Sequence, residues 1–134
     1  MGDLDIIRAN ARLAIEEMGP LSGLGTDFGF NRDSVVWVEG YIERLRTSGQ
    51  FREQRALNNL CSVLGSFLGE CLIHAYGGEW RNHDGRWGVY FRNESAAFPF
   101  SKVIKQFEGG LDAGDSILGF FDLVPKVLFE QADE

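Results

Sequence analysis

The segment from Phe51 to Trp80 constrains the fold more than any other part of the chain. Its apolar side chains recur at steps of three and four, which is the spacing of one face of an α-helix. These residues are Leu57, Cys61, Leu64, Leu68, Cys71 and Ala75. Gly77 and Gly78 follow, and glycine readily adopts the left-handed conformation found just past a helix end. The pattern predicts a long central helix over about residues 51–76, with its second half buried.

Two glycines, Gly65 and Gly69, lie inside this predicted helix. Each costs about 1 kcal/mol relative to alanine in a helix interior, so a packing reason is expected. With Cys61 they form a stripe of small residues, which predicts tight helix–helix or helix–strand packing. A membrane dimerisation motif is the alternative, but polar residues interrupt the apolar run, and a membrane span needs about 20 apolar residues.

The hydrophobic period changes after the central helix. Asp84-Gly85 is a strong signal for a β-hairpin turn. Apolar and polar residues then alternate from Trp87 to Phe91, which is typical of a strand with one buried face. A third strand is expected over Ala96–Phe98. Together these signals predict an antiparallel meander of about three strands over about residues 78–98.

Helical patterns also precede the central helix and follow the predicted meander. The spacing predicts a first helix over Asp3–Met18, ended by Gly19-Pro20. Asp33 is a suitable N-cap for a second helix that ends at Thr47. Pro99 fits the start of a helix, and Asp115 is expected to cap a last helical region. The predicted fold class is therefore α+β, with helices first, a short meander, and helices at the C-terminal end.

The chain is acidic and of single-domain size. Its 134 residues predict one domain over 1–134, and its net charge is −7. Residues 108–134 carry one basic and seven acidic side chains, which is −6 of that −7. An acidic chain lacks the electrostatic footprint of nucleic-acid or anionic-lipid binding, so neither partner is expected. The acidic end could attract a basic partner or could simply be a solvated face.

The N-terminal residues and the cysteines favour a cytoplasmic location. Met1–Asp5 is acidic where a signal peptide would be basic. Cys61 and Cys71 lie on one predicted helix, where a rise of about 15 Å separates them. This exceeds disulfide reach, which is about 7 Å between Cα atoms. We therefore expect two buried free thiols in a reducing compartment.

Histidine chemistry has two candidates. His74 lies one helical turn after Glu70, and His83 lies in the predicted hairpin. These three residues could form a metal site of one carboxylate and two histidines. Nothing in the sequence brings them together, so a hydrogen-bonded helical pair and a separate turn histidine is the preferred interpretation. We predict no metal site and no cofactor.

Nucleophilic catalysis has no clear candidate in the sequence. Both cysteines fall on the apolar helix face, where thiols are usually inert. The serine within Leu64–Gly69 does not have the spacing of a nucleophile elbow. We therefore predict no catalytic residues, and enzymatic activity is disfavoured.

The end of the central helix and the hairpin hold the candidate binding residues. Glu70 stands among apolar neighbours, and a buried carboxylate needs a partner. We expect an arginine of the sheet to supply it, and Arg81, Arg86 and Arg92 are the choices. Trp80 and Trp87 flank the turn as either sheet core or an exposed aromatic platform. The candidate binding residues are Glu70, His74, Trp80, His83 and Trp87.

Three short motifs carry a resemblance to known domains. They are Leu64-Gly65-x-x-Leu68-Gly69-Glu70, Tyr76-Gly77-Gly78-Glu79-Trp80 and Phe98-Pro99-Phe100-x-x-Val103. Over about residues 55–107 the chain resembles small bacterial domains of unknown function. Some families of this size and acidity are immunity proteins that neutralise toxins, so the resemblance implies a possible immunity role but no specific contact residue.

These observations lead to a functional expectation with alternatives. We expect a non-catalytic, cytoplasmic protein-interaction module, with immunity as one form of that role. The alternative is a small-ligand or metal-binding domain that uses Glu70, His74 and the 80–87 hairpin. A structural or oligomerising role is a third possibility, and the sequence leaves the oligomeric state open.

Overall fold

The computed structural model describes residues 2–49 and 53–132. Within these ranges the chain forms five α-helices, two 3-10 helices and one three-stranded antiparallel sheet. The elements are α1 (Asp3–Ser22), η1 (Gly25–Asp27), α2 (Arg32–Ser48), α3 (Gln54–Tyr76), β1 (Glu79–His83), β2 (Arg86–Tyr90), β3 (Ala96–Ala97), α4 (Pro99–Gly109), η2 (Leu111–Ala113) and α5 (Ile117–Ala132). The predicted α+β layout is confirmed.

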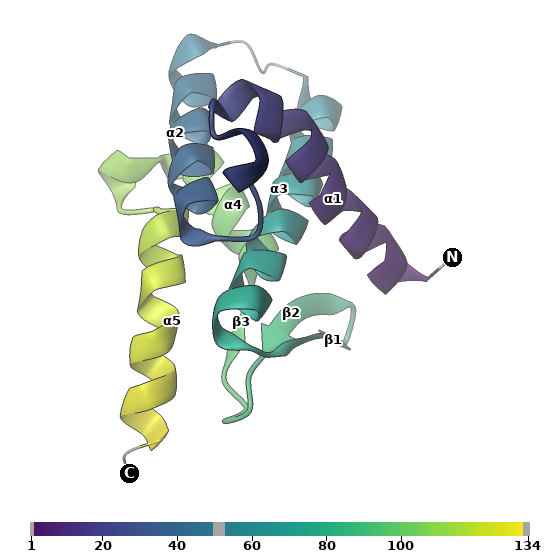
Figure 1. Cartoon of the computed structure of the whole chain (residues 1–134), viewed down its shortest axis with the longest axis vertical. Helices are drawn as coiled ribbons and strands as arrows, with labels where there is room; N and C mark the ends of the chain where they lie inside the picture. The colour runs from purple at the N-terminus through teal and green to yellow at the C-terminus, as the bar shows by residue number, and fades with distance from the viewer. Residues whose placement is uncertain (1, 50–52, 133–134) are drawn as a thin grey trace.

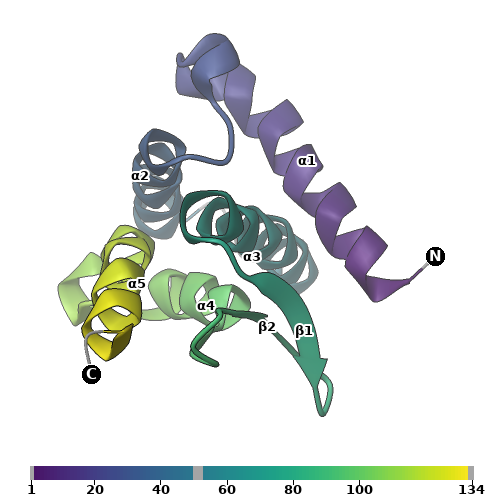
Figure 2. The same cartoon turned by 60° about the horizontal axis from the view of Figure 1, so that its bottom comes forward.

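The helix α3 is the centre of the fold. Figure 2 shows it in the middle of the molecule, with α1, α2, α4, α5 and the hairpin arranged around it. Five of its large or sulfur-containing side chains are fully buried: Leu64, Phe67, Leu68, Cys71 and Leu72. The helix ends at Tyr76, as predicted, but Gly77 follows at φ 79° and ψ −164°, which has the positive φ of a glycine and is not the left-handed helical conformation that was expected. The predicted start at Phe51 lies outside the described residues, and Ala75, which was assigned to the buried face, is exposed.

The two glycines inside α3 make close packing possible, as predicted. A Cβ atom on Gly65 would overlap the ring of Phe100, which belongs to α4. A Cβ atom on Gly69 would overlap the indole of Trp80, which belongs to β1. The small-residue stripe therefore serves one helix–helix contact and one helix–strand contact.

The sheet has the order β1-β2-β3, and a tight turn joins its first two strands. Asp84 and Gly85 both adopt positive φ, 54° and 85°, which is what a two-residue Asp-Gly hairpin turn requires. Trp80 pairs with Val89 across β1 and β2. The strand β3 is shorter than predicted because Phe98 leaves the sheet to become the N-cap of α4.

The helix α1 continues past its predicted end. Gly19-Pro20 was expected to stop it, but the helix runs on to Ser22 and contains Pro20. Proline removes one backbone donor, so Pro20 costs the helix one hydrogen bond but does not end it. The left-handed residue that ends the helix is Gly23, at φ 75°.

Two helices are capped by a residue just beside the predicted one. The side chain of Asn31, not Asp33, caps α2 by accepting a hydrogen bond of 2.9 Å from the backbone N–H three residues on. Ser116, not Asp115, caps α5 in the same way, also at 2.9 Å. In each case neighbouring residues have comparable capping ability, so local propensity does not choose between them.

By length and composition α3 could cross a membrane. It has 23 residues, and its most apolar window reaches a mean hydropathy of 1.4. Half of that window is buried inside the protein, and Figure 1 shows other helices on both sides of it. The core helix of a soluble protein has the same length and hydropathy. The burial of α3 among the other helices fits such a core helix.

Candidate functional site

The structure brings two of the predicted site residues together, Glu70 and Trp80. The indole Nε1 of Trp80 donates a hydrogen bond of 2.8 Å to a carboxylate oxygen of Glu70. Trp80 is only 7% exposed, and its ring centroid lies 5.6 Å from that of Phe100. This hydrogen bond therefore links α3 to β1. Trp80 itself belongs to the hydrophobic core.

The prediction that an arginine of the sheet pairs with Glu70 is wrong. Among the residues that the structure describes, Glu70 takes part in no ion pair. Arg81 instead lies 2.7 Å from Glu79 and 3.4 Å from Glu94, and Arg86 stacks 3.6 Å above the Phe98 ring centroid. Side chains alternate between the two faces of a strand, and the register puts both arginines on the sheet face opposite Trp80.

The two histidines lie apart from this pair. His74 is exposed, and its ring centroid lies 5.0 Å from that of Phe30. His83 is exposed on the outer face of the hairpin, 4.9 Å from the Tyr90 ring. Within residues 2–49 and 53–132 no three histidine, cysteine, aspartate or glutamate side chains are grouped so that they could hold a metal ion. Glu70 and the histidines thus do not converge on one point.

Trp87 has a different environment from Trp80, although both project from the same sheet face. It pairs with Asn82 across the hairpin and is only half-buried. Asn82 and Trp87 line an open cleft of about 550 Å³ between the hairpin and the N-terminal half of α1. We call this space the hairpin cleft. Of the two predicted roles for the tryptophans, Trp80 takes the core role and Trp87 lies at a surface cavity.

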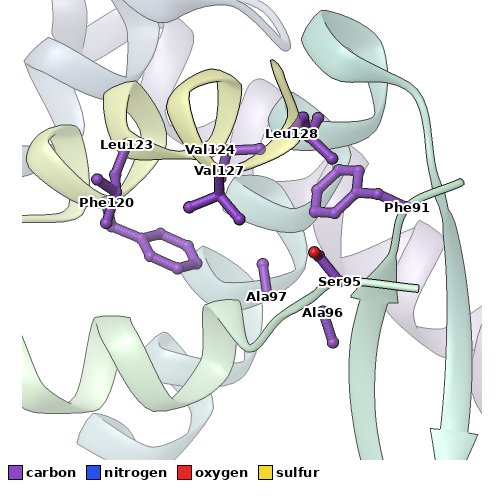
Figure 3. A pocket seen from close by; sticks show the side chains of 9 residues that line it. All are labelled: Phe91, Ser95, Ala96, Ala97, Phe120, Leu123, Val124, Val127 and Leu128. Carbon is purple, nitrogen blue, oxygen red and sulfur yellow. The ribbon is translucent and has the colours of Figure 1, made fainter. Parts of the chain in front are cut away.

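A second cavity lies between α5 and the end of the meander, and we call it the α5 pocket. Its volume is about 140 Å³. Its walls are Phe91, Ser95, Ala96, Ala97, Phe120, Leu123, Val124, Val127 and Leu128. Figure 3 shows the α5 side chains on one side and the β3 segment on the other, with Ser95 the only hydroxyl among them. Leu123 and Val127 remain 53% and 37% exposed.

The α5 pocket was not predicted from the sequence. The apolar spacing of α5 was visible, but it does not show which of those residues the rest of the chain leaves uncovered. The available signal was an apolar face broader than one buried stripe, because Leu123 and Val127 extend it beyond Phe121 and Val124.

A buried polar network joins α2, α4 and α5, and it too was missed. Gln106 is fully buried, and its Nε2 donates to Glu43 Oε2 at 3.0 Å and to the Glu39 carbonyl at 3.2 Å. Its Oε1 accepts from the backbone N–H of Ile117 at 3.0 Å, and Glu39 also accepts from the Ser116 hydroxyl. Every buried polar side-chain atom in the described chain has a partner, so the network is structural.

Both cysteines are buried free thiols, as predicted. Burial, with a smaller contribution from the carboxylate of Glu108, raises the pKa of Cys61 to about 11. Burial also raises the pKa of Cys71 far above its ordinary value. The thiolate is the nucleophilic form, so neither side chain is suited to covalent catalysis near neutral pH.

No protein-family model, curated protein or solved structure matches this chain. The resemblance to small bacterial domains of unknown function therefore stays a prediction that rests on its three motifs, and so does the immunity role that it implies.

Proposed function

We propose that this chain is a non-catalytic protein-interaction domain of the bacterial cytoplasm, and that its partner inserts an apolar side chain into the α5 pocket. The pocket itself is the observation that carries the proposal. Specific interfaces concentrate their binding energy where a large side chain of one protein fills a desolvated pocket of the other. A pocket of about 140 Å³ with almost wholly apolar walls suits one large aliphatic or aromatic side chain.

The exposure of Leu123 and Val127 supports this role. These side chains continue the apolar wall of the pocket onto the surface. Single exposed apolar residues are ordinary, but a contiguous apolar pocket and rim commonly marks an interaction site. Covering both side chains would bury additional apolar surface on binding.

The charge of the chain favours a basic partner. The net charge is −7, and residues 108–134, which include α5, hold −6 of it. The negative electrostatic potential of such a surface raises the rate of association with positively charged proteins and repels acidic ones. A basic toxin neutralised by an acidic immunity protein is one pairing that fits this chemistry, and the motif resemblance supports it.

The alternative small-ligand or metal function through Glu70, His74 and the hairpin has weaker support. Glu70 is already engaged by Trp80, and the exposed imidazoles of His74 and His83 contact other rings. A ligand that binds Glu70, His74 and His83 at once would have to contact three side chains that the fold keeps apart.

The test compares Val127→Asp with Val36→Asp, because both valines are exposed on a helix, at 37% and 43%. Tagged wild-type and variant chains are used to isolate cross-linked partners from a bacterial lysate, and the affinity of any identified partner is then measured. We expect a basic partner that binds wild type and Val36→Asp but is lost with Val127→Asp. Recovery of no partner in repeated experiments, or equal binding by both variants, would refute the proposal.

A further inference from the structure

We propose that the hairpin cleft is a second, separate site, and that it binds a neutral polyhydroxylated ligand of mono- or disaccharide size. The cleft lies on the side of the sheet near α1 and α4, away from the α5 pocket. Its volume of about 550 Å³ is within the range of small-molecule sites, about 300–1,000 Å³. The proposal does not depend on the function assigned to the α5 pocket.

Several polar groups that line the cleft have no partner within the described chain. These are the half-buried amide of Asn10, the hydroxyl of Ser101 and the indole Nε1 of Trp87. Asn82 uses its Oδ1 to accept from the Gly85 N–H at 2.8 Å, which leaves its amide NH₂ available. These groups come from α1, β1, β2 and α4, and they converge on one cavity without satisfying one another.

The charges in the cleft favour a neutral ligand. Asp3 and Arg86 are its two charged residues, so the lining has no net charge. An anion would meet the Asp3 carboxylate, whereas the hydroxyl groups of a neutral ligand can donate hydrogen bonds to it. Arg86 reaches only the margin of the cleft, because the register puts its side chain on the other face of the sheet from Trp87, where the guanidinium stacks on the Phe98 ring at 3.6 Å.

Trp87 supplies the apolar surface that such a ligand needs. A sugar ring has one face of C–H groups and an edge of hydroxyls, so it requires an aromatic platform beside hydrogen-bonding side chains. Trp87 is half-buried in the cleft wall, with a free indole N–H, and it stands next to Asn82 and Arg86. This combination of an indole, two amides and a hydroxyl fits a polyhydroxylated ring better than an apolar or a strongly ionic molecule.

The experiment is an NMR titration of the whole chain with D-glucose, D-galactose and N-acetyl-D-glucosamine, each alone, and with inorganic phosphate as the charged probe. We expect at least one sugar to shift the indole N–H of Trp87 and the side-chain amides of Asn10 and Asn82, with saturation. The indole N–H of Trp80 is the internal reference, because Glu70 already binds it. It should not move.

Variants connect the shifts to the cleft. We expect Asn10→Ala to weaken sugar binding about tenfold through loss of a hydrogen bond. Asn59→Ala is the matched control, because Asn59 is exposed on α3 and does not line the cleft. Saturable shifts that Asn10→Ala weakens and Asn59→Ala preserves would support the proposal. It is overturned if no sugar causes saturable shifts, if phosphate causes the same shifts, or if Asn10→Ala binds as wild type does.

Discussion

The indole Nε1 of Trp80 donates a 2.8 Å hydrogen bond to the carboxylate of Glu70, ten residues earlier in the chain. This bond connects the last part of α3 to the start of β1, across the short turn that joins the two elements. It satisfies the polar atom of a side chain that is otherwise in the core, while the half-buried carboxylate keeps contact with solvent. This hydrogen bond therefore adds a directional polar contact to the apolar packing of Trp80 against the central helix.

Removing the acceptor should destabilise the protein. In Glu70→Leu the buried indole N–H loses its partner, so we expect a loss of about 1–3 kcal/mol in the free energy of unfolding. Glu70→Gln keeps a side-chain oxygen that can accept, and it should lose less than about 1 kcal/mol. Urea unfolding followed by tryptophan fluorescence measures both. Equal losses in the two variants would show that the hydrogen bond does not contribute.

The close approach of Trp80 to α3 gives a second prediction. Gly69→Ala should lose about 1–3 kcal/mol, because the added methyl group would overlap the indole ring. Gly40→Ala in α2 is the control, since its methyl would meet only the flexible Arg44 Nη1 at 3.3 Å. That variant should gain up to about 1 kcal/mol from helix propensity. Thermal or urea unfolding separates the two, and a Gly69→Ala protein as stable as Gly40→Ala would contradict the packing interpretation.

Local signals account for the part of the fold that sequence reasoning predicted. The spacing along Leu57–Leu72 and the Asp84-Gly85 turn each act over a few residues, so both were visible without knowledge of the fold. The partner of Glu70 was not visible in this way. It depends on the register that pairs Trp80 with Val89, and that register places the indole toward α3 and the neighbouring Arg81 away from it.

The cavities and the buried polar network could not be predicted from the sequence, because they too depend on contacts between residues that are distant in the chain. The α5 pocket forms between Phe91 of the meander and Val127 of α5, which are distant in the chain. Gln106 has no apolar character, yet it occupies a buried position because Glu43 and the Ile117 N–H meet it there. Such long-range matches between polar groups have no periodicity that a single sequence could reveal.

Gln106 should therefore be sensitive to an apolar replacement. Gln106→Met keeps a side chain of similar length but leaves the Ile117 N–H and the Glu43 carboxylate without this partner, at a cost of about 1–3 kcal/mol. Hydrogen exchange at the Ile117 amide should become faster. Gln54→Met is the control, because Gln54 is exposed and, among the residues that the structure describes, its side chain bonds only to that of Asn58. If both variants were equally stable, the network would not contribute to the packing of α4 against α2 and α5.

The buried thiol of Cys61 predicts how stability depends on pH. Its pKa is raised to about 11 in the folded chain, while a free cysteine has a pKa of about 8.5. Between these values the unfolded chain binds fewer protons than the folded chain, so stability falls as pH rises. From about pH 7 to about pH 10, wild type should lose about 2 kcal/mol more than Cys61→Ala. Urea unfolding under reducing conditions measures both slopes, and identical slopes would show that burial does not hold this thiol protonated.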